Sequence, residues 1–152
     1  MIMLHPQLCL YSVVQFPSEV VAIVGDTITL KCAFSIQAGK PSPAKGAMSW
    51  FRGPSETKSE VIPGGRFSLS YPDTFHRPGE GQLMIANVSL EDAGCYTCQV
   101  MLWGEGEARG NGIKLHVYGK SNPLFALLHN SIYALFSLHV GALVLSTGYR
   151  GI

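Results

Sequence analysis

The chain has 152 residues, which is enough for one domain of ordinary size with some length to spare. Its formal net charge is +1 and 14% of its residues are charged, which excludes a protein that binds nucleic acid through a strongly basic surface. Hydrophobic residues make up 47% of the chain and are concentrated near the C-terminus. The four cysteines indicate an oxidising, extracellular setting.

The first ten residues, 1–10, are predicted to be the remnant of a secretory signal peptide. They are mostly apolar and contain Cys9, but they lack the basic start and most of the apolar core of a complete signal. A first strand is the alternative interpretation of this segment. If the segment is removed in the mature protein, Cys9 leaves with it and needs no partner.

In the first half of the chain, apolar and polar residues alternate in several short runs, which is typical of strands. The stretch 15–26 predicts a first strand with a kink at Pro17 that ends in a Gly-Asp turn. The next strand passes through Cys32, and a loop with two prolines and two glycines follows over 35–47. In the strand after it, Trp50 points inward and Phe51 therefore points to the opposite face.

The second half is predicted to continue as an all-β chain. Paired strands are expected at 66–70 and 82–85, with a short strand at 60–62 before them. The stretch 104–110 is predicted to be a flexible hairpin loop, because it is rich in glycine. A last strand is expected over 110–117, entered through a glycine bulge.

The segment from Asp92 to Cys98 has the pattern of a tyrosine corner, in which a tyrosine lies two residues before a cysteine. The hydroxyl of Tyr96 is expected to bond to the backbone a few residues upstream. Cys32 lies 66 residues before Cys98, and Trp50 lies between them, where it would pack on a Cys32–Cys98 bridge.

Arg66 begins a predicted strand at the place where variable-type immunoglobulin domains carry an arginine that pairs with the turn aspartate, which is Asp92 here. Together with the cysteines, the tryptophan and the tyrosine, this ordered set predicts an immunoglobulin variable-type sandwich over residues 11–118.

One face of this sandwich is predicted to bind a protein. Alternation from the inward-pointing Cys98 places four residues on the outer face beside Phe51: Thr97, Gln99, Met101 and Trp103. Of these, we expect Phe51, Gln99, Met101 and Trp103 to form the ligand-binding surface, because aromatic anchors dominate interface energies. Cys95 points the same way and is either a free thiol or one end of an intermolecular bridge.

No enzyme is indicated by the sequence. A set of nucleophile, acid and base is not apparent, and the five histidines are scattered without the spacing of metal ligands. We therefore expect no catalytic residue, no metal and no cofactor. The tripeptide Asn87-Val88-Ser89 is a sequon for N-linked glycosylation at Asn87.

A membrane helix is predicted over residues 124–145. These 22 residues contain no Asp, Glu, Lys or Arg, and at about 1.5 Å per residue they span a hydrocarbon core of about 30 Å. A buried helix is the alternative, but a sandwich of this size has nowhere to bury it. The segments 119–123 and 146–152 are then a stalk and a short cytoplasmic tail. The N-terminus is extracellular, and the protein crosses the plasma membrane once.

His129 and Asn130 are polar residues inside this apolar segment. Polar groups at that depth are costly and usually face another helix or water. One interpretation is a neutral imidazole near the headgroups. The other is a contact from His129 to an acidic residue in the membrane helix of a partner.

Several segments together resemble the natural cytotoxicity triggering receptors, which are activating receptors of natural killer cells. They are the opening Ile2-Met3-Leu4-His5-Pro6 with Cys9, the strand Trp50-Phe51-Arg52, the string Gly110-Asn111-Gly112, and the membrane segment around Tyr133-Ala134.

The resemblance implies a non-enzymatic receptor that binds ligands on stressed or tumour cells through the face of Phe51, Gln99, Met101 and Trp103. It also implies signalling through a membrane arginine that pairs with an aspartate of the zeta or Fc-receptor gamma chain. His129 stands at the matching position here, and histidine is charged only part of the time near neutral pH. The alternative function is a butyrophilin-like costimulatory ligand or adhesion molecule that does not signal by itself.

Overall fold

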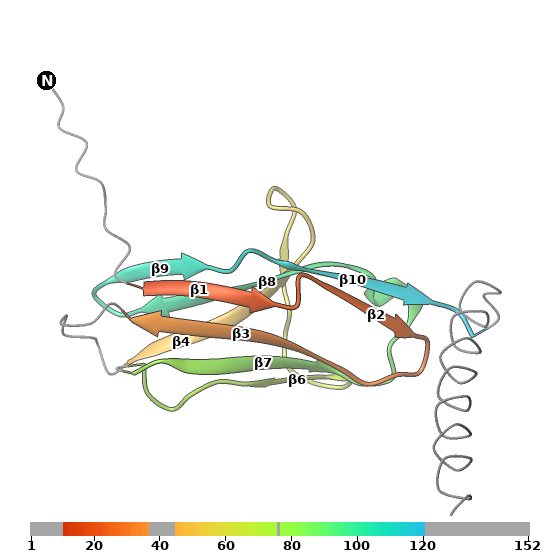
Figure 1. Cartoon of the computed structure of the whole chain (residues 1–152), viewed down its shortest axis with the longest axis horizontal. Coiled ribbons are helices and arrows are strands. Elements are labelled where there is room, and N and C mark those ends of the chain that lie inside the picture. The colour runs from red at the N-terminus through yellow and green to blue at the C-terminus, as the bar shows by residue number, and fades with distance from the viewer. Residues whose placement is uncertain (1–10, 37–44, 76, 121–152) are drawn as a thin grey trace, which may run out of the picture. The chain divides into compact units, whose positions relative to one another are not determined.

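The computed structural model describes residues 11–36, 45–75 and 77–120, which form two β-sheets (Figure 1). The first sheet has the strand order β1-β3-β7-β6. Its strands are β1 (Tyr11–Phe16), β3 (Ile28–Ile36), β7 (Gly79–Ile85) and β6 (Phe67–Ser70). These strands are joined in antiparallel pairs.

The second sheet has the order β2-β10-β8-β4-β5, and β9 also pairs with β8. Its strands are β2 (Glu19–Ile23), β10 (Ile113–Tyr118), β8 (Gly94–Leu102), β4 (Gly46–Arg52), β5 (Ser59–Glu60) and β9 (Gly106–Arg109). A short 3-10 helix, η1 (Leu90–Asp92), precedes β8. The predicted all-β sandwich of the immunoglobulin variable type is confirmed in this part of the chain.

The core lies between the two sheets, where buried side chains alternate with more exposed ones along β3, β4 and β7. Within the described ranges, sixteen buried apolar residues form one cluster: Ala22, Leu30, Cys32, Phe34, Met48, Trp50, Phe75, Leu83, Ile85, Val88, Tyr96, Cys98, Val100, Leu102, Ile113 and Leu115. Both sheets contribute to the cluster, so its burial holds them face to face.

A disulfide joins the two sheets at the centre of the core. Cys32 of β3 and Cys98 of β8 are bonded, with their Cα atoms 6.4 Å apart. Trp50 lies opposite Cys98 in the register of β4 and β8 and is fully buried. The disulfide predicted from the sequence is therefore confirmed.

The predicted first strand over 15–26 is wrong as a single element. The structure has two strands in this region, β1 in one sheet and β2 in the other. Pro17 separates them, and a proline has no N–H group with which to continue a ladder. After the break, the carbonyl oxygen of Ser18 accepts a hydrogen bond from the backbone nitrogen of Lys114 at 2.9 Å, which brings the chain onto β10.

The predicted loop over 104–110 is also partly wrong, because residues 106–109 form β9. This strand pairs with β8 from Gln99↔Arg109 to Leu102↔Gly106. Strands β9 and β10 pair with successive parts of β8, and they are separated by an irregular segment over 110–112. Gly112 has a φ of +88° there, a conformation that favours glycine.

Other differences concern the ends of elements. Strand β7 begins at Gly79, three residues before the predicted start, and β5 ends at Glu60, where the predicted strand begins. In the described part of the chain, no helix is long and apolar enough to cross a membrane. The predicted signal remnant (1–10) and membrane segment (124–145) lie outside the described residues.

Candidate ligand-binding face

The start of β8 is fixed by the tyrosine corner and a charged pair beneath it. The hydroxyl of Tyr96 donates to the carbonyl oxygen of Asp92 at 2.7 Å, and burial raises the pKa of Tyr96. The guanidinium of Arg66 donates to both carboxylate oxygens of Asp92, at 2.7 and 3.0 Å. These hydrogen bonds hold the pKa of Asp92 below its usual range. The strand that carries the candidate face therefore begins from a rigid turn.

Two large apolar side chains are exposed where β8 ends. Met101 is 44% exposed and Trp103 is 58% exposed. They line a shallow hollow together with Leu102, Gly104, Gly106 and Glu107. We call residues 101–107, from the end of β8 to the start of β9, the β8–β9 tip.

Backbone hydrogen bonds hold the tip in place. The backbone nitrogen of Glu105 donates to the carbonyl oxygen of Leu102 at 3.1 Å, and that of Trp103 donates to Lys45 at 3.3 Å. The hydroxyl of Tyr11 in β1 donates to the carbonyl oxygen of Glu105 at 2.7 Å. The exposed indole is therefore carried by a turn that is tied to both sheets.

Gln99 lies on the expected face of β8 but is not available as an open contact, because it is only 8% exposed. Its side-chain amide donates to the carboxylate of Glu107, which also accepts from Arg109 at 3.1 Å. Both partners belong to β9. The expectation of an accessible Gln99 is therefore corrected, and the cause is the strand that was predicted to be a loop.

Phe51 is on the same face but not in the same patch. It lies opposite Thr97 in the register of β4 and β8. Because Thr97 is six residues before Trp103, Phe51 and Trp103 are about 20 Å apart along the strand. The ammonium of Lys58 lies 4.6 Å from the centre of the Phe51 ring and partly covers it. The face thus has two apolar spots instead of one cluster of three residues.

Cys95 is an exposed free cysteine and lies opposite Lys114 in the register of β8 and β10. Cys9, His129 and Asn130 lie outside the described residues, so the structure does not place the predicted adapter contact.

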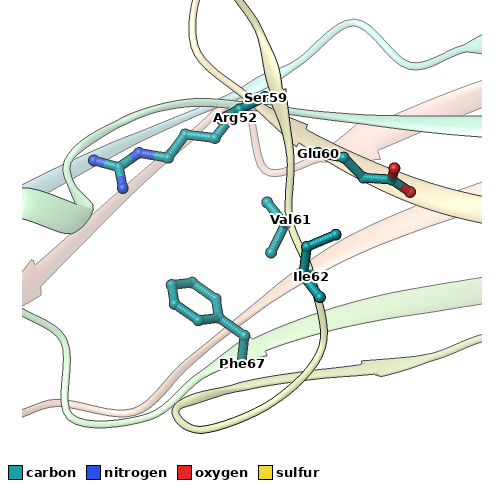
Figure 2. Close-up of a pocket in the computed structure, with 6 residues that line it drawn as sticks. All are labelled: Arg52, Ser59, Glu60, Val61, Ile62 and Phe67. Carbon is teal, nitrogen blue, oxygen red and sulfur yellow. The ribbon is translucent and has the colours of Figure 1, made fainter.

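A second hollow lies between β5, at the edge of one sheet, and Phe67 in β6, at the edge of the other (Figure 2). Val61 and Phe67 face each other across it in Figure 2. The guanidinium of Arg52 and the carboxylate of Glu60 extend to opposite sides and do not converge on the hollow. Convergent polar groups would be needed to orient a small ligand, so this hollow is a weaker candidate than the tip.

Gln15 is an important residue that the sequence reasoning missed. It is 2% exposed, and its side-chain oxygen accepts from the backbone nitrogens of Cys98 (3.2 Å) and Gly112 (2.8 Å). Its side-chain nitrogen donates to the carbonyl oxygen of Tyr96 at 3.0 Å. Gln15 thereby fills the gap between β9 and β10 and links β1 to the other sheet. A polar residue at an inward position of an alternating strand is the signal that could have indicated it.

Residues 15–118 match the family model of the immunoglobulin V-set domain. The chain belongs to the immunoglobulin V-set family. Over 165 aligned residues the V-set chain is 32% identical to natural cytotoxicity triggering receptor 3 of Homo sapiens, covering 97% of this chain and 78% of the relative.

Relatives of the same name from other mammals give similar values. The V-set chain is 33% identical to the protein of Macaca fascicularis, covering 92% of this chain and 83% of the relative. For Rattus norvegicus the identity is 34%, over 82% of this chain and 72% of the relative. The resemblance to natural cytotoxicity triggering receptors that the sequence analysis predicts is therefore confirmed.

Proposed function

We propose that the chain is a cell-surface immune receptor that recognises a protein on another cell through the β8–β9 tip. The observation that carries this proposal is the exposure of Met101 and Trp103 on a turn held by hydrogen bonds to both sheets. A rigid turn loses little conformational entropy on binding, and tryptophan is among the residues that contribute most at interfaces.

The tip also carries charge beside its apolar centre. Glu107 is at its edge and pairs with Arg109 in β9. An apolar centre with a polar rim is the usual anatomy of a protein interface. Phe51 is proposed as a second contact further along the same face. The ligand is a protein surface with an apolar recess for the indole of Trp103.

The proposed role agrees with the printed names of the relatives, which are cytotoxicity triggering receptors. By that analogy the receptor triggers natural killer cell cytotoxicity from the plasma membrane. It would signal through an acidic membrane adapter such as the zeta or Fc-receptor gamma chain, with His129 and Asn130 as the contacts in the membrane segment.

The binding face is tested by substitution at the tip. Cells of tumour lines are stained with the dimerised ectodomain as wild type, Trp103→Ala, Met101→Ala and Phe51→Ala. We expect each substitution to weaken half-maximal binding at least about fivefold, which corresponds to about 1 kcal/mol. Leu90→Ala is the matched control, because Leu90 is an apolar residue of similar exposure (59%) in η1, at the other end of β8. Unchanged binding of the Trp103 and Met101 variants would contradict the proposal.

Signalling is tested separately from binding. The full chain is co-precipitated with each adapter from cells that express both, as wild type and as His129→Ala. We expect the wild type to recover an adapter and the variant to lose it. If no adapter is recovered and crosslinking of the chain gives no signal, the alternative of a butyrophilin-like ligand or adhesion molecule is favoured instead.

A further inference from the structure

The sequon Asn87-Val88-Ser89 lies between the end of β7 and the start of η1. Asn87 is exposed, whereas Val88 is fully buried in the core. The carbonyl oxygen of Asn87 accepts a hydrogen bond from Arg66 at 3.0 Å. Among the described residues, its side-chain amide has no hydrogen-bond partner. The amide nitrogen is therefore accessible on a segment that its neighbours hold in place.

The backbone hydrogen bonds that hold this segment do not involve the side chain of Asn87. The backbone nitrogen of Val88 donates to Asp26 at 2.9 Å, and the carbonyl oxygen of Val88 accepts from Gly25 at 2.8 Å. A sugar attached to the amide of Asn87 would disturb none of these bonds. Burial of Val88 keeps the backbone anchored while the neighbouring side chain points into solvent.

We propose that Asn87 carries an N-linked glycan in the mature protein. The position fits such a group because it is far from the proposed binding surface. Strand β8 starts beside η1 and ends at the β8–β9 tip, and its nine residues span about 26 Å. Figure 1 shows β9 starting at the left end of the sandwich, whereas β7 ends toward the right. The glycan therefore covers one end of the sandwich and leaves Met101 and Trp103 open.

The transfer forms a bond between Nδ2 of Asn87 and the anomeric carbon of the first sugar. The bond between that carbon and a lipid diphosphate breaks, and the diphosphate leaves with its electron pair while the amide loses one proton. The donor is a lipid-diphosphate-linked oligosaccharide, which the secretory compartment supplies. That compartment is oxidising, in agreement with the Cys32–Cys98 disulfide.

A structural role is the competing explanation for asparagine at this position. Asn87 has a φ of +47°, and asparagine adopts this left-handed conformation more readily than most residues. Glycine adopts it as well but cannot carry a glycan. Asn87→Gly therefore separates the two explanations. Ser89 needs a matched pair of variants, because its hydroxyl also donates to Asp92 at 3.2 Å. Ser89→Thr keeps the sequon and a hydroxyl, whereas Ser89→Ala removes both.

The full chain is expressed in mammalian cells with a cleavable secretory leader added to every variant. The fraction that contains the Cys32–Cys98 disulfide is isolated and treated with an amidase that releases N-glycans. We expect the wild type and Ser89→Thr to lose mass, and the peptide that contains residue 87 to show aspartate there. The masses of the Asn87→Gly and Ser89→Ala variants should not change on this treatment.

The outcome that would overturn the proposal is a disulfide-bonded wild-type chain whose peptide retains unmodified Asn87 before treatment. A loss of mass that persists in Asn87→Gly would overturn it as well. The wild-type peptide gives the answer even if a variant fails to fold. None of these readouts requires the ligand, so the result is independent of the proposed receptor function.

Discussion

Buried hydrogen-bonding side chains join the two sheets of this domain at particular residues. Gln15 is the clearest case, because one side chain satisfies two backbone nitrogens and one carbonyl oxygen of the opposite sheet. The nitrogen of Gly112 belongs to the irregular segment between β9 and β10, and the other two groups belong to β8 beside that segment, where the regular ladder is interrupted. A buried backbone group that loses its partner costs about 1–3 kcal/mol. The irregular edge therefore depends on this one glutamine.

Gln15→Leu should lower the free energy of unfolding by about 3 kcal/mol, because it leaves the nitrogens of Cys98 and Gly112 without their partner. Denaturant unfolding of the domain measures the change through its midpoint, with an unchanged slope. Ser12→Ala is the control on the same strand. Ser12 is exposed and its hydroxyl bonds to the exposed hydroxyl of Ser35 at 2.8 Å, where water can replace the lost partner, so the change should alter stability by less than about 0.5 kcal/mol. If Gln15→Leu is as stable as the wild type, Gln15 does not stabilise the link between the two sheets.

Asp92 makes the stability of the domain dependent on pH. Its pKa is held below its ordinary value chiefly by the hydrogen bonds from Arg66. A carboxyl group whose pKa is lower in the folded state stabilises the fold above its unfolded pKa, and this contribution is lost as the pH falls through the folded pKa. Asp92→Asn should therefore be less stable than the wild type at pH 7, and the difference should shrink below about pH 3.8.

Thermal unfolding of both proteins from pH 7 to pH 2.5 tests this. The pKa of Glu80 is also lowered, mainly by Gln82, but its effect is common to both proteins and cancels in their difference. Asp73→Asn, at an exposed aspartate, is the control and should match the wild type at every pH. A stability gap for Asp92→Asn that is constant over the whole range would contradict the assignment.

At the scale of elements, the sequence predicts strands that are regular and misses those that depend on a distant partner. The alternation around Cys32 and Trp50 predicts their inward orientation, because a buried face requires a period of two. The split of the first strand into β1 and β2 could not be read from the residues, because it depends on the pairing of Ser18 with Lys114, which lies far along the chain.

Strand β9 is the second element that the sequence does not predict. The stretch 104–110 contains three glycines and several charged residues, all of which disfavour strands locally. It pairs with β8 because the adjoining edge of β8 would otherwise be open. This error also affected the candidate site, because Glu107 and Arg109 of β9 cover Gln99. The exposure of Met101 and Trp103 could be predicted, since it follows from the period of β8.

The hydrogen bond from Tyr11 to Glu105 links β1 to the β8–β9 tip. Tyr11→Phe should increase hydrogen exchange at the backbone amide of Glu105 about fivefold, because the local opening costs about 1 kcal/mol less. Global stability should change by less than about 1 kcal/mol, because the bond is exposed. Tyr71→Phe, at a 54% exposed tyrosine after β6, is the control. An unchanged exchange rate in Tyr11→Phe would show that other contacts hold the tip.

At the scale of the whole molecule, the two proposed sites lie at opposite ends of the sandwich. One end carries the β8–β9 tip, and the other carries η1 and Asn87. Other exposed apolar residues in the described ranges are spread over several elements, including Val21 in β2 and Met84 in β7. Scattered residues of this kind are common on soluble surfaces. The tip differs because its two large apolar side chains share a hollow.

The disulfide sets the stability of the whole domain, because it closes a loop of 66 residues between the sheets. In the chain-entropy model a loop of this length contributes about 4 kcal/mol, a large share of the stability of a small domain. The double variant Cys32→Ala, Cys98→Ala should therefore unfold at much lower denaturant concentration than the wild type. Cys95→Ser should unfold at the same denaturant concentration as the wild type, since Cys95 is exposed and is not part of the disulfide.

Thiol labelling of the native protein gives an independent check. A water-soluble thiol reagent should modify the peptide that contains Cys95 without denaturant, because this thiol is free and exposed. The side chains of Cys32 and Cys98 are buried and bonded to each other, so the peptides that contain them should be labelled only after reduction and unfolding. Labelling of Cys98 in the native protein would contradict the disulfide across the sheets. A Cys95 peptide that becomes reactive only after reduction would instead show that Cys95 forms an intermolecular bridge, and the tip would then have to be considered in a covalent dimer.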